Sequence, residues 1–128
     1  MVAQARAEAP NECCGLLAGR DGRVLRRYAV TNAEASPYRY NMDSRELLQA
    51  LRDMDEQGWD LLGIYHSHTH TPAYPSPTDV SLAFYPEAFY LLISLMAPEQ
   101  PAVRAFRIVE GQISEAEVEV VSGVSFQV

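Results

Sequence analysis

The residues in this sequence that could do chemistry are two histidines, a serine and an acid that lie close together in the chain. The sequence reads His66-Ser67-His68, and Ser76 and Asp79 follow a short segment that contains prolines. Side chains at positions i and i+2 of a strand point to the same side, about 6.6 Å apart, so both imidazoles can lean onto one ion. Two histidines and a carboxylate form a three-ligand set. Catalytic zinc sites commonly use three protein ligands and leave the fourth position for water.

A hydrolytic metal site also needs a base, and Glu12 is the candidate. Zinc lowers the pKa of bound water to about 7, and a nearby carboxylate can then take the proton. Glu12 comes directly before a short apolar run that begins with Cys13 and Cys14. Fe(II) or Mn(II) would accept the same donor atoms, but zinc is redox-silent and suited to hydrolysis. We therefore expect zinc.

Each of these residues also has a purely structural interpretation. His66 and His68 can be ordinary core or surface histidines. Ser76 and Asp79 can be no more than the cap of a helix. Glu12 can be only the charged end of a strand. A capping aspartate is nevertheless compatible with metal binding, because one carboxylate oxygen can turn outward.

Three further residues invite a chemical role that we do not expect. His70 continues the alternation of the two histidines, but Pro72 follows closely and the strand is expected to end, so His70 should face solvent or substrate. Cys13 and Cys14 are the only cysteines, and adjacent cysteines rarely form an ordinary disulfide. We expect small core residues rather than catalytic thiols or a disulfide framework.

Apolar stretches predict the strands that carry these residues. The run at 13–18 indicates a buried strand, and Asp21-Gly22 indicates a hairpin turn into a returning strand at 24–30. The run at 61–65 is typical of a central strand covered on both faces, and it leads directly into the histidines. Further strands are expected at 89–95, 103–109 and 112–121.

Three helices and a loop complete the predicted fold. Residues 2–9 are rich in alanine and stop at Pro10. The segment 43–46 has the pattern of a capping box, and apolar residues then follow one helical face up to Gly58. Ser76 is the expected N-cap of a short helix through Phe84, and 31–42 is expected to be a loop. The sequence therefore predicts an α/β fold with a mixed β-sheet flanked by helices.

Composition limits the function classes. The chain has 128 residues with no linker or repeat, which predicts a single domain over 1–128. Acidic residues number 17 against 10 basic ones, and the net charge of −7 argues against nucleic acid and anionic membranes as partners. Every basic residue is arginine, so lysine-based chemistry is excluded. The absence of an apolar leader or long apolar run predicts a cytoplasmic protein.

The five candidate residues together resemble the signature of the JAMM (MPN+, Mov34/Pad1) metalloprotease family. The match comprises Glu12 and the interval His-x-His-x₇-Ser-x₂-Asp that runs from His66 to Asp79. The resemblance covers about residues 2–121 and implies a cytidine-deaminase-like α/β fold with one zinc per chain. It also implies that His66, His68 and Asp79 are the zinc ligands. Glu12 would be the general acid/base, and Ser76 would donate a hydrogen bond to the oxyanion.

Within that family, the stretches 66–69, 73–80 and 106–111 are similar to the bacterial Mec-type enzymes. This similarity implies a hydrolase that removes cysteine from the C-terminal Gly-Gly of a ubiquitin-like sulfur-carrier protein, a step of cysteine biosynthesis. His70 departs from the pattern, because a small residue is expected there. The short stretch after Asp79 leaves no room for the insertion by which eukaryotic deubiquitinases of the family grip a second ubiquitin.

Two other functions compete with this one. An isopeptidase that removes small ubiquitin-like modifiers would use the same five residues, as archaeal relatives in the family do. A non-catalytic scaffold of the same fold would generally lack the ligand set, which this chain keeps. A cupin would be built mostly from strands, and the helix expected at 44–57 disfavours it.

Overall fold

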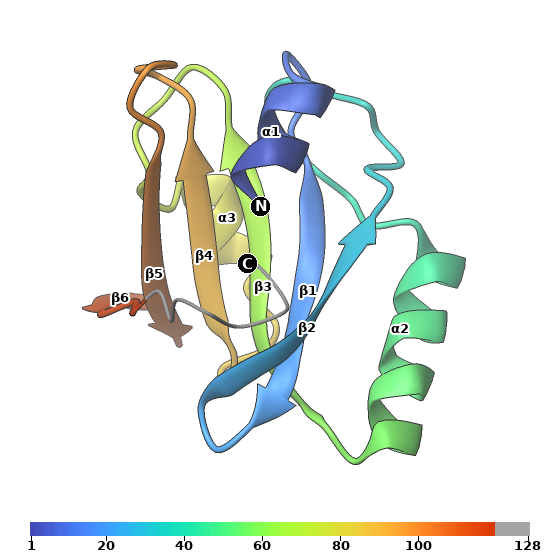
Figure 1. The fold of residues 1–128 in the computed structure, drawn as a ribbon. Coiled ribbons are helices and arrows are strands. Elements are labelled where there is room, and N and C mark those ends of the chain that lie inside the picture. Colours follow the sequence, from blue (N-terminus) through green and yellow to red (C-terminus); the bar gives the residue numbers. More distant parts are fainter. Residues whose placement is uncertain (120–128) are drawn as a thin grey trace.

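Six strands form one mixed sheet with helices on both faces in the computed structural model, which describes residues 1–119 (Figure 1). The strand order is β2-β1-β3-β4-β5-β6, and only β3 and β4 are parallel neighbours within the described chain. The strands are β1 (Cys14–Arg20), β2 (Arg23–Val30), β3 (Asp60–His68), β4 (Phe89–Ser94), β5 (Ala102–Val109) and β6 (Gln112–Ala116). The helices are α1 (Val2–Glu8), α2 (Ser44–Gln57) and α3 (Pro77–Ser81). This architecture confirms the predicted fold class.

Apolar side chains pack on both faces of the sheet, as the run at 61–65 predicted. On one face, Leu16 and Ile64 belong to a cluster with Met54 of α2. On the other face, Tyr65 belongs to a cluster with Ala5 of α1. Figure 1 shows α1 in front of the sheet and α3 behind it. Burial on both sides makes β3 a central strand of the core, and the residues at its end are therefore held by packing on both faces.

The two histidines lie at the end of β3 and face the α2 side of the sheet. Successive residues of a strand point to opposite faces, so Ile64, His66 and His68 share one side. The antiparallel pairing of β1 with β3 sets Cys14 opposite His66. Glu12 lies two residues before the start of β1, so the pairing of β1 with β3 brings it to the histidines.

The parallel pair β3–β4 brings α3 to the same place. Parallel neighbouring strands need a crossover that carries the chain back to the end of the sheet where the first strand began. The crossover passes through α3, whose N-cap is Ser76. Ser76 Oγ accepts a 3.1 Å hydrogen bond from the N–H of Asp79, and Asp79 Oδ2 accepts a 2.8 Å bond from the N–H of Ser76. This complete capping box fixes the Asp79 side chain at the start of α3.

Turn and cap residues behave largely as the sequence predicted. Asp21 and Gly22 both have positive φ, 51° and 75°, as the tight β1–β2 hairpin requires. Gly58 ends α2 in the left-handed conformation at φ 73°. Asp43 caps α2 by accepting a hydrogen bond from the N–H of Glu46.

Three expected boundaries or contacts were wrong in detail. The capping box of α2 is half formed, because the Glu46 carboxylate accepts from the N–H of Thr31 instead of Asp43. Helix α3 ends at Ser81 rather than Phe84, since the chain must turn into the segment before β4. Strand β6 ends at Ala116, and the last positions of the expected strand, 120–121, lie outside the described residues.

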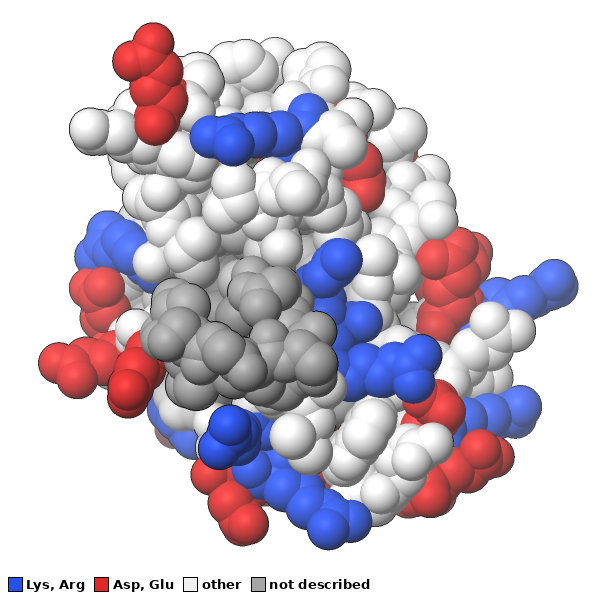
Figure 2. Space-filling view, in the orientation of Figure 1, with Lys and Arg blue, Asp and Glu red and all other residues white. Residues whose placement is uncertain are grey.

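The surface carries both signs of charge. Arginine and acidic side chains are interspersed over the described part of the face that carries α1 (Figure 2), although the net charge is −7. Across residues 1–119, the helices are all too short or too polar to span a bilayer.

Candidate metal centre

The imidazoles of His66 and His68 and the carboxylate of Asp79 converge on one point between β3 and α3. His66 Nε2 lies 3.1 Å from His68 Nε2 and 3.1 Å from Asp79 Oδ1, and His68 Nε2 lies 3.0 Å from Asp79 Oδ2. One ligand atom from each residue can be chosen so that all three lie within 4.8 Å of one another. The alternation along β3 and the capping box of α3 therefore assemble the predicted ligand set.

Burial and hydrogen bonding prepare the two imidazoles differently. Burial lowers the pKa of His66, so this ring is neutral and keeps a lone pair. Burial also lowers the pKa of His68, but its contacts with Asp79 and the Pro72 carbonyl outweigh this and raise it. His68 Nδ1 lies 2.9 Å from the Pro72 oxygen, so Nδ1 carries the proton and Nε2 is left to face the cluster.

Asp79 is held as a carboxylate. Burial on its own would raise its pKa, but the contacts with His66 and His68 and the N–H of Ser76 hold that pKa well below its usual range. The capping and the metal-binding interpretations of Asp79 are therefore compatible in this structure. Asp79 completes the helix cap and also turns its two oxygens towards the histidines.

Glu12 is buried beside this cluster, with 5% of its surface exposed. Burial raises the pKa of Glu12, the nearby His68 lowers it and Asp79 raises it, and together they bring the pKa to about 7. Its Oε1 has no hydrogen-bond partner among the described residues. A buried carboxylate oxygen without a partner is costly, so an unpaired one marks a place where a further group or water is expected.

Zinc fits the donor set. Two imidazole nitrogens and a carboxylate oxygen are typical ligands of catalytic zinc. Atoms about 2.0–2.1 Å from a tetrahedral ion lie about 3.3 Å from one another, close to the separations of 3.0–3.1 Å between the facing atoms here. A cation would also relieve the crowding of these polar atoms in a buried place.

The remaining chemical candidates fall outside the cluster. His70 is exposed and its Nδ1 lies 3.0 Å from Thr69 Oγ1, as expected for a residue beyond the strand end. Cys13 and Cys14 are unpaired, fully buried core residues on opposite faces of the sheet, as predicted. Burial raises the pKa of both thiols, that of Cys14 to about 12.

Sequence reasoning missed three residues that hold the cluster together. Ser67, between the histidines, accepts a 2.8 Å hydrogen bond from the N–H of Cys13. Asn32 donates a 3.0 Å bond to the carbonyl of Glu12. The Tyr40 ring stacks on His66 with the centroids 4.4 Å apart. Asn32 and Tyr40 lie in the expected loop, where no periodic pattern marks an inward-facing side chain.

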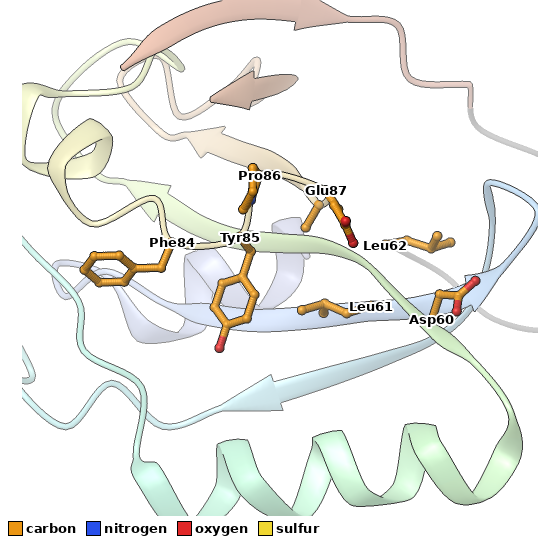
Figure 3. A pocket seen from close by; sticks show the side chains of 8 residues that line it. Asp60, Leu61, Leu62, Phe84, Tyr85, Pro86 and Glu87 are labelled. Atoms are coloured by element: carbon orange, nitrogen blue, oxygen red, sulfur yellow. The ribbon is translucent and has the colours of Figure 1, made fainter. Parts of the chain in front are cut away.

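A separate cavity of about 600 Å³ lies towards the other end of β3 (Figure 3). Residues 60–62 of β3 and 84–88 before β4 line it. Leu61 is five residues from His66, about 16 Å along an extended strand. None of the five candidate residues lines this cavity, so it is distinct from the candidate metal centre.

A family comparison agrees with this geometry. The model described as "Prokaryotic homologs of the JAB domain" matches residues 1–109. The chain belongs to this family. The match includes all five candidate residues, and it confirms the family relationship that the motif indicated.

Individual relatives of this JAB-domain protein are similar over most of its length. It is 48% identical over 123 residues to the CysO-cysteine peptidase of Mycobacterium tuberculosis, covering 94% of this chain and 84% of the relative. It is 40% identical over 106 residues to the probable TtuB-protein conjugate cleaving protease of Thermus thermophilus, covering 82% of this chain and 67% of the relative.

Two solved structures share this fold at very different levels of sequence identity. A protein from Desulfitobacterium hafniense, solved in solution, has a TM-score of 0.87 and 44% identity, covering 98% of this chain and 88% of that one. A JAB1/MPN domain protein from Archaeoglobus fulgidus has a TM-score of 0.58 and 18% identity, covering 94% and 90%. The second likeness supports the α/β fold alone.

Proposed function

We propose that this protein is a zinc-dependent metallopeptidase that releases cysteine from the C-terminal Gly-Gly of a ubiquitin-like sulfur-carrier protein. The observation that carries the proposal is the buried carboxylate of Glu12, whose unpaired oxygen lies beside a set of three convergent ligand residues. The 48% identity to a CysO-cysteine peptidase supports the choice of substrate.

In this proposal His66, His68 and Asp79 hold one zinc ion per chain. Zinc bound there would polarise the scissile carbonyl and lower the pKa of water. The chain's own residues do the rest. His68 is kept in the ligating tautomer by the Pro72 carbonyl, and Asp79 is kept ionised by its contacts with His66, His68 and the N–H of Ser76.

Glu12 moves the proton in the proposed reaction. Its unpaired Oε1 takes a proton from the attacking water and returns it to the nitrogen of the leaving cysteine. A pKa near 7 suits both halves of this transfer at neutral pH. Burial keeps the carboxylate away from bulk water that would compete for the proton.

Ser76 stabilises the charge that develops on the carbonyl oxygen. Its Oγ accepts from the N–H of Asp79, which fixes the oxygen in place. The hydroxyl hydrogen is left free to donate to an oxyanion. The same capping bond therefore positions Ser76 for the role that the family resemblance implies.

We further propose that the whole chain forms one catalytic domain that acts in the cytoplasm. Two buried, unpaired cysteines suit a reducing compartment. The net charge of −7 favours a protein partner over nucleic acid or an anionic membrane.

The deciding experiment is the intact mass of a bacterial sulfur-carrier protein that ends in Gly-Gly-Cys, after incubation with the zinc-loaded protein. We expect the loss of one cysteine, and we expect a chelator to abolish it. Glu12→Gln protein serves as the matched control, because it should retain the metal. If no cysteine is lost from a sample shown to hold stoichiometric zinc, this substrate is rejected.

A second candidate function is the cleavage of isopeptide links to small ubiquitin-like modifiers. The 40% identity to a probable TtuB-protein conjugate cleaving protease favours it. A carrier joined to a lysine side chain, assayed beside the cysteine adduct, separates the two. A non-catalytic scaffold would bind no zinc and would cleave neither substrate. The presence of all three candidate ligands in this chain disfavours that alternative.

A further inference from the structure

Tyr40 is the side chain that lies on His66, and nothing in the proposed reaction uses it. We infer that Tyr40 is a positioning residue for His66, whose imidazole is oriented by ring stacking instead of by a hydrogen bond to Nδ1. The inference rests on the metal site of the proposed function. It concerns how that site is held rather than which residues bind the ion.

The two histidines differ in how their outer nitrogens are satisfied. A metal-binding histidine usually donates its other ring N–H to a carboxylate, a carbonyl or water, which fixes the tautomer and the ring orientation. His68 follows this rule through Pro72, at 2.9 Å. His66 does not, because its buried Nδ1 has no hydrogen-bond partner among the described residues. Something else must therefore fix the His66 ring.

The Tyr40 ring is in the right place to do so. Its centroid lies 4.4 Å from that of His66, and the planes are inclined by 27°, so the rings are stacked. The His68 ring is inclined to His66 by 62°, with the centroids 5.0 Å apart. The stacked Tyr40 ring and the contact with His68 at Nε2 together restrict rotation of the His66 imidazole. Aromatic contacts of this kind have directional preferences beyond the area they bury.

A hydrogen-bonded loop holds Tyr40 against His66. Asn32 Nδ2 donates to the carbonyl of Arg39 at 3.1 Å, and Asn32 Oδ1 accepts from the N–H of Asn41 at 3.0 Å. These are the residues on either side of Tyr40. Asn32 also donates to the Glu12 carbonyl at 3.0 Å, so one buried amide holds both the stacking ring and the proposed base.

The inference predicts that the planar ring of Tyr40, and not its hydroxyl, sets the affinity of the site for zinc. Replacing a hydrogen-bonding partner that orients a metal ligand typically costs 10–100-fold in metal affinity, and we expect a loss of similar size for a stacking partner. Tyr40→Met keeps an apolar side chain of similar size but removes the flat face. Tyr40→Phe keeps the face and removes only the hydroxyl. Tyr38, two residues away and 83% exposed, provides a control in Tyr38→Met.

The test titrates the zinc-loaded protein with a chromophoric chelator and compares dissociation constants. We expect Tyr40→Met to bind zinc about 10-fold or more weakly, while Tyr40→Phe and Tyr38→Met match the wild type. Tyr40 also packs against the apolar cluster of the α2 face, so the unfolding temperature of each chelated protein is measured alongside. Tyr40→Leu is carried as a second variant in case Tyr40→Met does not fold.

Each other outcome overturns part of the argument. A Tyr40→Met protein with wild-type zinc affinity, whatever its unfolding temperature, would show that the ring only packs. Equal losses in Tyr40→Phe and Tyr40→Met would assign the effect to the hydroxyl and contradict stacking. A wild-type protein that binds no zinc would overturn the proposed metal site itself, and this inference with it.

Discussion

The main-chain N–H of Cys13 donates a 2.8 Å hydrogen bond to Ser67 Oγ, and the N–H of Ser67 donates a 3.0 Å bond to the Cys13 carbonyl. Ser67 stands between the two histidines, and Cys13 follows Glu12. These two bonds therefore tie the segment that carries the proposed base directly to the strand that carries two proposed metal ligands.

Ser67→Ala tests this connection. We expect it to lower the free energy of unfolding by about 1–3 kcal/mol, because the buried N–H of Cys13 loses its side-chain acceptor. Turnover should fall more than zinc affinity, since Glu12 and not the ligand set loses support. Urea unfolding, the cysteine-release assay and chelator competition measure the unfolding free energy, the turnover and the zinc affinity. Ser81→Ala, at an exposed hydroxyl of α3, is the control, and an unchanged unfolding free energy in Ser67→Ala would contradict the prediction.

Glu12→Gln and His68→Ala should separate catalysis from metal binding. Glu12→Gln keeps all three proposed ligands, so we expect full zinc content and a turnover lowered by about 100-fold or more. His68→Ala removes a ligand and should lose both zinc and turnover. Metal content by mass spectrometry and the cysteine-release assay provide the readouts. Wild-type turnover in Glu12→Gln would remove Glu12 from the mechanism.

Removing the metal should destabilise the fold. An ion that binds only the folded state stabilises it by about 2.7 kcal/mol at a free concentration 100-fold above its dissociation constant. Thermal unfolding with chelator, and again after zinc is restored, measures this shift. We expect the unfolding temperature of His68→Ala to stay unchanged on adding chelator and on restoring zinc, because its ligand set is incomplete. An unfolding temperature of the wild-type protein that is likewise unchanged by chelator and zinc would argue against a resident metal.

Gly15→Ala should be strongly destabilising for a steric reason. A Cβ at Gly15 would overlap the Tyr65 hydroxyl and the main-chain oxygen of Tyr28, and the second of these cannot move aside. We expect a loss of about 3 kcal/mol, the upper range for overpacking. Gly22→Ala is the comparison, because it meets no atom but has a φ of 75°, a strain of about 1–2 kcal/mol. Equal unfolding temperatures for the two variants would refute the steric explanation.

The two thiols should be unreactive in the folded protein. Burial raises the pKa of Cys14 to about 12 and raises that of Cys13, so the reactive thiolate is nearly absent at neutral pH. We expect no labelling by a thiol reagent at pH 7 and two labelled thiols in denaturant. The labelling rate of Cys14 should rise only as the pH approaches 12, whereas an exposed thiol would reach full reactivity near pH 9–10. Rapid labelling of the native protein at pH 7 would contradict the burial of both side chains.

The sequence was sufficient to predict the parts of this site that follow a repeating pattern. Alternation along a strand put His66 and His68 on one side, and the capping signature placed Asp79 at a helix start beside Ser76. Both features depend on residues that are near one another in the chain. The fold class followed for the same reason, because periodicity and turn residues mark most strands and helices.

Contacts between distant segments were not predictable in the same way. Tyr40 and Asn32 lie in a loop where no period distinguishes inward from outward side chains. Gly15 reads as an ordinary strand residue until the opposite strand supplies Tyr65. The short ends of α3 and β6 also depend on neighbours, since propensity alone would have extended both elements.

The position of β1 between β2 and β3 separates two events in the folding of this chain. The proposed ligands come from β3 and the start of α3, which are close together in the sequence. Glu12 joins them when β1, a distant segment, pairs with β3. Pairing of distant segments is the slow part of building a sheet. On refolding, we therefore expect binding of the proposed metal to return before turnover, because only turnover requires the distant segment that carries Glu12.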